Sequence, residues 1–159
     1  MKKIFPVFVI SLLVLAGVMW ANLDALKERF GGKSELCEAP YEVRWIPWEK
    51  GLVEAKRKEG NLVWLSFTAD WDLLSKVNEA RLFAADELQA KLAEYRVTLI
   101  RADMTQPEAE MKAELKKYGR DHLPANFVFP ADLSKEIIVL PEALSAEVAL
   151  EALDQAVGK

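Results

Sequence analysis

The chain has 159 residues, a length typical of one domain, with a formal net charge of −4 and a sequence pI near 5.2. No basic patch stands out, so we expect no nucleic-acid partner. One cysteine and one histidine exclude an internal disulfide and a zinc site of the usual Cys/His kind. We therefore expect neither a metal nor a cofactor.

Residues 1–23 have the character of a membrane signal anchor or a signal peptide. Lys2 and Lys3 precede an apolar run from Ile4 to Leu23, and about 20 apolar residues suffice to span a bilayer. No clean Ala-x-Ala cleavage site follows, which favours an uncleaved anchor over a cleaved signal. Either way the positive end stays in the cytoplasm and the rest is exported. We expect the domain on the periplasmic side of the inner membrane, or soluble in the periplasm after cleavage.

Residues 24–42 are predicted to form a mixed-charge tether that leads to a domain over residues 43–159. The tether contains Cys37, which is the one cysteine of the chain. An odd cysteine in an oxidising compartment indicates either an intermolecular disulfide or a free thiol. Both interpretations of Cys37 remain open from the sequence.

Strands and helices alternate through the domain. Strands are expected over Val43–Trp45, Leu62–Thr68, Arg96–Ala102, Asn126–Phe129 and Glu136–Leu140. Helices are expected over Glu49–Lys58, Leu73–Leu82, Ala85–Tyr95, Thr105–Tyr118 (with Thr105 as its N-cap and Gly119 as its C-cap) and Ser145–Val157. This alternation favours an α/β fold with helices flanking a central sheet. The two adjacent strands late in the chain favour a mixed sheet.

The most informative segment joins the strand that ends at Thr68 to the next helix. Phe67–Trp71 reads FTADW and Lys76–Glu79 reads KVNE. Together they resemble the active-site strand, loop and helix of the C-terminal thioredoxin-like domain of the DsbD family of membrane-bound thiol:disulfide interchange proteins. Leu123-Pro124, before a predicted strand, resembles the cis-proline loop of thioredoxin folds. The resemblance implies a thioredoxin-like fold across essentially the whole domain.

The chain departs from that family at the two positions that carry its chemistry. In the family, Cys-x-x-Cys directly follows the tryptophan, whereas Asp72 and Ser75 occupy those positions here. Disulfide exchange needs a thiolate that attacks sulfur, which neither a carboxylate nor a hydroxyl can replace. The resemblance therefore implies the fold without its redox activity, and we predict no catalytic residue.

Two interpretations of Asp72 and Ser75 follow from their chemistry. Asp72 is predicted to be the N-cap of the next helix, since Asp accepts hydrogen bonds from unpaired helical N–H groups. A catalytic alternative would make Asp72, His122 and Ser75 a hydrolase-like trio, because a serine nucleophile needs a base in reach. We expect Ser75 to face the core and His122 to be a solvated loop residue, which disfavours the trio.

Three residues are candidates for binding an extended polypeptide: Trp71, Leu123 and Pro124. Trp71 is expected to be half-exposed and to supply apolar contact, while the loop at Leu123-Pro124 offers backbone groups for strand-like pairing. The competing interpretation is that this loop is retained only for the fold.

The sequence thus predicts an exported, membrane-anchored thioredoxin-like module without redox-active cysteines. Its role would be binding or assisting in thiol–disulfide exchange or envelope-protein assembly, with a polypeptide or a membrane protein as partner. The alternative is a thiol:disulfide interchange component, a protein-disulfide reductase that uses Cys37 or cysteines of a partner.

Overall fold

The structure is a computed structural model that describes residues 44–159. The predicted signal segment 1–23, the tether 24–42 and Cys37 lie outside the described residues. Within residues 44–159, none of the helices combines the length and the apolar character that crossing a membrane requires.

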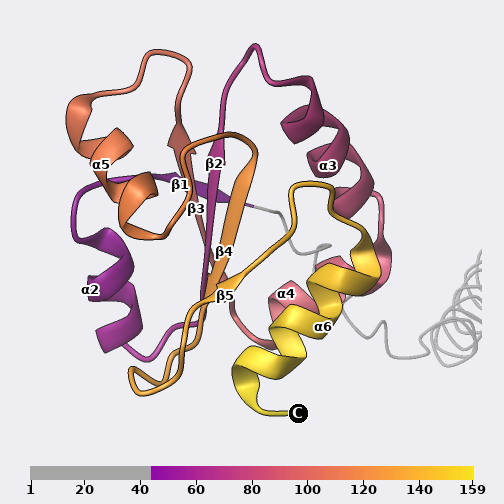
Figure 1. The fold of residues 1–159 in the computed structure, drawn as a ribbon. Helices are drawn as coiled ribbons and strands as arrows, with labels where there is room; N and C mark the ends of the chain where they lie inside the picture. The colour runs from indigo at the N-terminus through magenta and orange to yellow at the C-terminus, as the bar shows by residue number, and fades with distance from the viewer. Residues whose placement is uncertain (1–43) are drawn as a thin grey trace, which may run out of the picture. The chain divides into compact units, whose positions relative to one another are not determined.

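A five-stranded mixed sheet lies at the centre of the domain, with strand order β1-β3-β2-β4-β5 (Figure 1). Strand β3 is parallel to both β1 and β2, whereas β4 is antiparallel to β2 and to β5. The mixed sheet predicted from the two adjacent late strands is therefore confirmed. The strands are β1 (Trp45–Pro47), β2 (Val63–Thr68), β3 (Thr98–Asp103), β4 (Ala125–Phe129) and β5 (Ile138–Val139).

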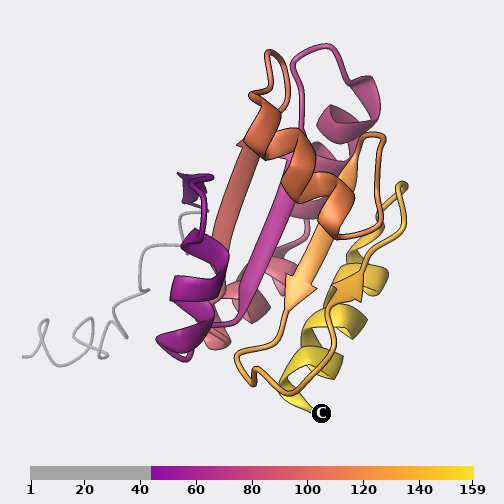
Figure 2. The ribbon, with the colours of Figure 1, turned by 60° about the vertical axis from the view of Figure 1, so that its left-hand side comes forward.

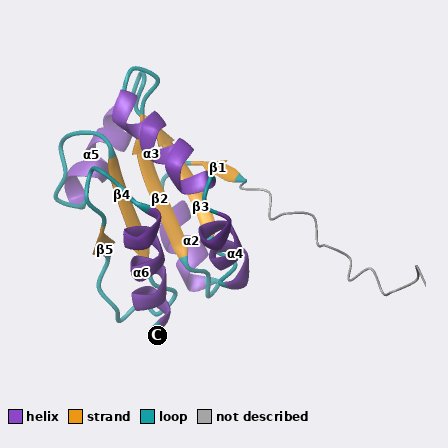
Figure 3. Cartoon of the chain, turned by 90° about the vertical axis from the view of Figure 1, so that its right-hand side faces the viewer, coloured by secondary structure: helices purple, strands orange, loops and turns teal. Residues whose placement is uncertain are grey.

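Helices cover both faces of this sheet. Helices α2 (Leu52–Lys58) and α5 (Ala109–Lys117) cover one face (Figures 1 and 2). The opposite face carries the other three helices, which stand in front of the sheet in Figure 3. They are α3 (Leu73–Phe83), α4 (Asp86–Glu94) and α6 (Ala146–Val157). Because successive side chains of a strand point to opposite faces, β2 contributes to two separate cores.

The core under α2 and α5, here called the α2–α5 core, is apolar throughout. Its buried residues include Val63, Leu65 and Phe67 of β2 together with Phe127 and Phe129 of β4. The second core, here called the α3–α6 core, contains Trp64 of β2 and leucines from α3, α4 and α6. Full burial of such a side chain contributes about 1.5–3 kcal/mol relative to exposure, so the two cores account for the stacking of three layers.

Tertiary pairing moved the two edge strands relative to the predicted bounds. Strand β1 covers Trp45–Pro47, whose three residues pair in register with Leu99–Arg101 of β3. Of the predicted strand Val43–Trp45, Arg44 precedes β1 and Val43 lies outside the described residues. Strand β5 is limited to Ile138–Val139, the residues that pair with β4. Edge strands make hydrogen bonds on one side only, so their ends depend on the neighbour.

Two helices begin later than the sequence patterns predicted. Helix α2 begins at Leu52, since its N-cap Gly51 takes the left-handed conformation with φ of 78°. Helix α5 begins at Ala109, because the predicted cap Thr105 is used elsewhere: its Oγ1 accepts a hydrogen bond from the Asp70 N–H at 2.9 Å. The end of α5 agrees better with expectation, since Gly119 follows the C-cap Tyr118 with a φ of 75°.

Candidate functional site

The sheet topology brings several loops to one end of the molecule. The parallel strands β2 and β3 end side by side at Thr68 and Asp103, and the Met104 N–H donates to the Thr68 carbonyl at 2.7 Å. The antiparallel strand β4 begins at the same end, with Ala125 opposite Phe67. The segments 69–72, 104–108 and 120–124 therefore share this end, here called the loop end.

Helix α3 begins at the loop end with Asp72 as its N-cap, as the sequence predicted. The Asp72 Oδ1 accepts a hydrogen bond from the Leu74 N–H at 3.2 Å, and its Oδ2 accepts one from the Ser75 hydroxyl at 2.5 Å. Ser75 faces inward with 8% of its surface exposed. The carboxylate thus satisfies an otherwise unpaired N–H of the first turn and holds the serine hydroxyl in place.

The three polypeptide-binding candidates differ in exposure. Trp71 is 66% exposed, more than the half-exposure expected, and Leu73 beside it is 74% exposed. The Leu123–Pro124 peptide bond is cis, as the resemblance implied. Pro124 is buried, and the half-buried Leu123 packs against the α2–α5 core. Trp71 is thus the large apolar surface of this candidate site, and the Leu123–Pro124 loop offers mainly backbone.

His122 takes no part in a site with Asp72 and Ser75. Its Nδ1 lies 2.8 Å from Asp121 Oδ1 and its Nε2 lies 2.8 Å from Glu142 Oε1. Since both oxygens are acceptors, this geometry fits the imidazolium, with a proton on each nitrogen. The hydrogen bonds to Asp121 and then to Glu142 raise the pKa of His122. Both ring nitrogens of His122 are taken up by carboxylates and the residue is exposed, so the hydrolase-like trio finds no support.

A buried asparagine fastens the loop of Glu142 to α3. The Asn78 amide donates to the Glu142 carbonyl at 2.6 Å and accepts from the Leu144 N–H at 3.1 Å. Asn78 is 3% exposed. Residues 141–144 are thereby a fourth segment at the loop end, beside the first turns of α3.

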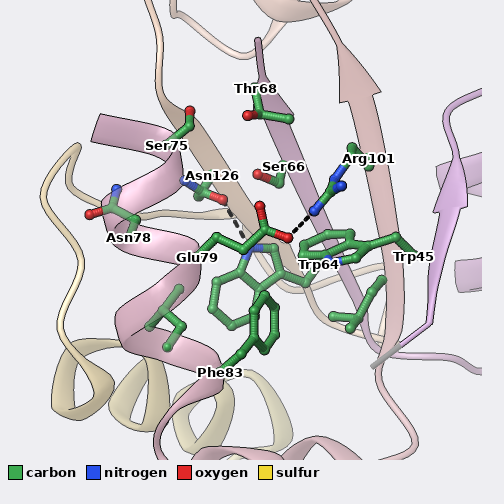
Figure 4. Close-up of a pocket in the computed structure, with 12 residues that line it drawn as sticks. Trp45, Trp64, Ser66, Thr68, Ser75, Asn78, Glu79, Phe83, Arg101 and Asn126 are labelled. Atoms are coloured by element: carbon green, nitrogen blue, oxygen red, sulfur yellow. Dashed lines mark hydrogen bonds and ion pairs between the residues drawn. The ribbon is translucent and has the colours of Figure 1, made fainter. Parts of the chain in front are cut away.

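Beneath α3 lies a small cavity of about 30 Å³ (Figure 4). A cavity of this size suits ordered water, since it exceeds one water-sized sphere of about 10–15 Å³ and falls far below the roughly 300 Å³ of organic-ligand sites. Apolar side chains line one end and polar side chains the other. Its lining residues are Trp45, Trp64, Ser66, Thr68, Ser75, Asn78, Glu79, Leu82, Phe83, Leu99, Arg101 and Asn126.

An ion pair closes one side of the cavity, where Glu79 of α3 reaches the guanidinium of Arg101 on β3 (Figure 4). The Arg101 guanidinium also lies 4.8 Å from the ring centre of Trp45. Among the described residues, Arg101 Nε and Trp45 Nε1 are buried donors without a hydrogen-bond partner. The pair therefore links β1, β3 and α3 but leaves two donors of the cavity wall unsatisfied.

Ser75 is the one cavity residue that was a site candidate from the sequence. Leu62–Thr68 was expected only as a strand. A signal for the cavity was present in the polar pair Ser66 and Thr68, which share one face of β2 because they are two residues apart. The partnership of Glu79 with Arg101, 22 positions apart, leaves no such signal.

Comparison with known proteins defines the class. A family model described as thioredoxin-like matches residues 44–131. The chain is 31% identical over 144 residues to the thiol:disulfide interchange protein DsbD of Ralstonia nicotianae, which covers 91% of this chain and 22% of that protein. The chain thus spans about a fifth of that relative's length.

Solved structures agree in fold. The C-terminal domain of DsbD from Neisseria meningitidis in its oxidised form superposes with a TM-score of 0.55 at 24% identity, covering 68% of this chain and 96% of that domain. Its reduced form gives a TM-score of 0.56 at 23% identity, with 70% and 99% covered. The chain belongs to the thioredoxin-like family, and its domain is similar to the C-terminal domain of DsbD.

Proposed function

We propose that this chain is an exported, membrane-anchored thioredoxin-like module without redox-active cysteines, which binds a polypeptide or membrane-protein partner and assists thiol–disulfide exchange or envelope-protein assembly. The observation that carries the proposal is the start of α3. Directly after Trp71, where the resemblance places Cys-x-x-Cys, Asp72 caps the helix and accepts a hydrogen bond from Ser75. This pair stabilises the helix start without any sulfur.

The distribution of cysteine supports the same proposal. The one cysteine of the sequence, Cys37, precedes the thioredoxin-like residues 44–131. No residue of the domain can therefore form the thiolate that attacks a disulfide. The exposure of Trp71 at the loop end supports the polypeptide-binding part of the proposal.

An insulin-reduction assay with dithiothreitol tests the absence of redox activity. The purified full chain should not raise the rate above that of dithiothreitol alone. The double substitution Asp72→Cys/Ser75→Cys should raise it, because it restores two thiols at the start of α3, where the helix dipole favours a thiolate. The single substitution Ser75→Cys is the matched control and should stay inactive. Catalysis by the unaltered chain would overturn the proposal.

Cys37→Ser distinguishes the alternative function. A thiol:disulfide interchange component that works through Cys37 would lose its mixed disulfides with partner proteins when this residue is replaced. The module proposed here should capture the same partners with or without Cys37. Non-reducing gels of trapped complexes separate these two cases.

The membrane anchor and its orientation are part of the proposal, supported by the apolar run Ile4–Leu23 after Lys2 and Lys3. A reporter enzyme that is active only outside the cytoplasm should be active when it is fused after Lys159, and a reporter that is active only in the cytoplasm should be inactive there. Alkaline carbonate washing should leave the chain in the membrane. A shortened soluble form would instead favour the cleaved signal, and an active cytoplasmic reporter would reject export.

A further inference from the structure

The loop end carries a surplus of negative charge around its exposed apolar residues. Six carboxylates lie on its four segments and on the last residue of β3, against Arg120 and His122. The whole chain has 25 acidic and 21 basic residues, so taking away these six carboxylates and one arginine leaves the remainder close to neutral. The six are Asp70, Asp72, Asp103, Glu108, Asp121 and Glu142.

The two basic residues at the loop end, Arg120 and His122, are already engaged. Arg120 directs its Nη2 toward the Leu140 carbonyl at 3.5 Å, and His122 lies between two of the carboxylates. The next exposed cations beside these segments are Lys76, one turn into α3, and Lys112, in the first turn of α5. The negative charge of this surface is therefore only partly compensated by the domain itself.

Contacts tie the carboxylates to the apolar surface on two sides. On one side, the Asp70 N–H donates to Thr105 Oγ1 at 2.9 Å, and the Thr105 N–H donates to Asp103 Oδ1 at 2.8 Å. Asp70 directly precedes Trp71, so these contacts attach Asp103 to the backbone next to Trp71. Hydrogen bonds to Thr105 lower the pKa of Asp103, which keeps it ionised at neutral pH.

On the other side, His122 joins Asp121 to Glu142, and Glu142 is fastened to α3 through Asn78. The residue after His122 is Leu123 of the cis peptide bond. The hydrogen bond to His122 lowers the pKa of Asp121, which is therefore also ionised at neutral pH. Carboxylates thus flank both parts of the candidate binding surface.

We propose that the loop end binds an extended polypeptide segment that is both apolar and basic, with an apolar side chain against Trp71 and Leu73 and with lysine or arginine side chains beside the carboxylates. This inference rests on the proposed polypeptide-binding function and names the chemistry of the partner. A field of one sign around an apolar contact attracts a partner of opposite charge and rejects one of like charge. Large exposed apolar side chains mark a contact surface when they form a contiguous patch.

Three synthetic peptides of equal length test the inference on the full chain in detergent. Each carries central leucines, flanked by lysines in the first peptide, serines in the second and glutamates in the third. Isothermal titration should give at least tenfold tighter binding of the lysine peptide than of the glutamate peptide at about 50 mM salt, with the serine peptide between them. The preference should shrink in about 0.5 M salt, because salt screens exposed charges.

Paired variants locate the charges responsible. Asp70→Asn/Glu108→Gln removes two exposed carboxylates that make no side-chain ion pair among the described contacts, and should reduce the preference for lysine at least threefold. Glu87→Gln/Glu151→Gln removes two exposed carboxylates from α4 and α6 as a matched control and should leave it unchanged. An equal loss in both variants would overturn the inference, because it would reflect net charge alone.

Trp71→Ala separates this inference from the function on which it rests. Binding of the lysine peptide should fall at least tenfold in this variant, since a well-packed aromatic anchor dominates such contacts. If all three peptides bind equally and Trp71→Ala weakens each of them, the polypeptide-binding function stands and the inference fails. If the lysine peptide does not bind, or binds Trp71→Ala as well as the unaltered chain, both fail.

Discussion

The two faces of the sheet use the same strands for different purposes. On the α2–α5 face, aromatic rings of β2 and β4 pack against each other and against the C-cap of α5. The ring centroids of Phe67 and Phe127 lie 5.9 Å apart, and those of Tyr118 and Phe129 lie 5.2 Å apart. On the opposite face, β2 places Ser66 and Thr68 under the first turns of α3, beside a cavity. The α2–α5 face is apolar along the whole length of β2, whereas the opposite face becomes polar toward the loop end.

This difference separates stability from positioning. Burial of aromatic and aliphatic side chains supplies most of the free energy of folding, and the α2–α5 face does this without interruption. Polar contacts contribute less net free energy but have defined geometry, so they fix where a loop lies. Asn78, Asp72 and His122 do this on the α3 side, where they position the loops around Trp71.

The largest effect is expected from Phe127→Ala in the α2–α5 core. Phe127 is fully buried between the rings of Phe67, Tyr118 and Phe129, so truncation leaves a cavity and should lower the free energy of unfolding by about 3–5 kcal/mol. Urea unfolding followed by tryptophan fluorescence measures this. Val139→Ala, at a site 44% exposed on β5, should change stability by less than about 1 kcal/mol. Equal effects at both sites would contradict the placement of Phe127 in a tightly packed core.

A smaller but still clear loss is expected from Asn78→Ala on the polar face. The substitution leaves the Leu144 N–H and the Glu142 carbonyl without their partner, and an unsatisfied buried group costs about 1–3 kcal/mol. Asn78→Asp is the matched variant, because it keeps the acceptor for Leu144 and loses the donor for Glu142.

Amide hydrogen exchange distinguishes positioning from general destabilisation. The Leu144 amide should exchange faster in Asn78→Ala than the amides of β4, because residues 141–144 lose their attachment to α3. Uniform acceleration across the sheet would mean that Asn78 acts through the core and would remove the distinction between the two faces.

The third expected loss of stability comes from substitution of the N-cap at the start of α3. Asp72→Ala removes the N-cap acceptor of the Leu74 N–H and should cost about 0.5–2 kcal/mol. Asp72→Asn keeps an oxygen acceptor and should cost less. Thermal unfolding compares the two variants. A loss as large as that of Phe127→Ala would show that Asp72 supports more than the helix cap.

The smallest expected effect is a pH dependence of the folding stability that arises from the contacts of His122. The carboxylates raise its pKa in the folded state, so the stability from this contact is complete below the unfolded value of about 6.5 and is lost as the pH rises through the raised pKa. His122→Gln should therefore have a lower melting temperature than the unaltered chain at about pH 5. The two melting temperatures should converge at alkaline pH. A difference that grows with pH would reverse the assigned protonation state.

The sequence by itself determined the elements and much of the candidate site. The apolar runs around β2 and β4 and the helix patterns placed every predicted strand and helix of the domain in the chain order that the structure has. Asp72 as an N-cap and Gly119 after α5 could be predicted because capping depends on residues within one turn of each other. The cis bond before Pro124 was implied by the resemblance to thioredoxin folds.

Only the tertiary structure decided the partners of the polar residues and the ends of the edge strands. Thr105 looked like a helix cap but accepts a hydrogen bond from Asp70, and Arg101 in mid-strand pairs with Glu79 of α3. His122 looked free but lies between two carboxylates, one of them 20 positions away. Local patterns report which residues are apolar and which can cap, whereas a polar side chain's partner depends on which distant segments the folded sheet brings together.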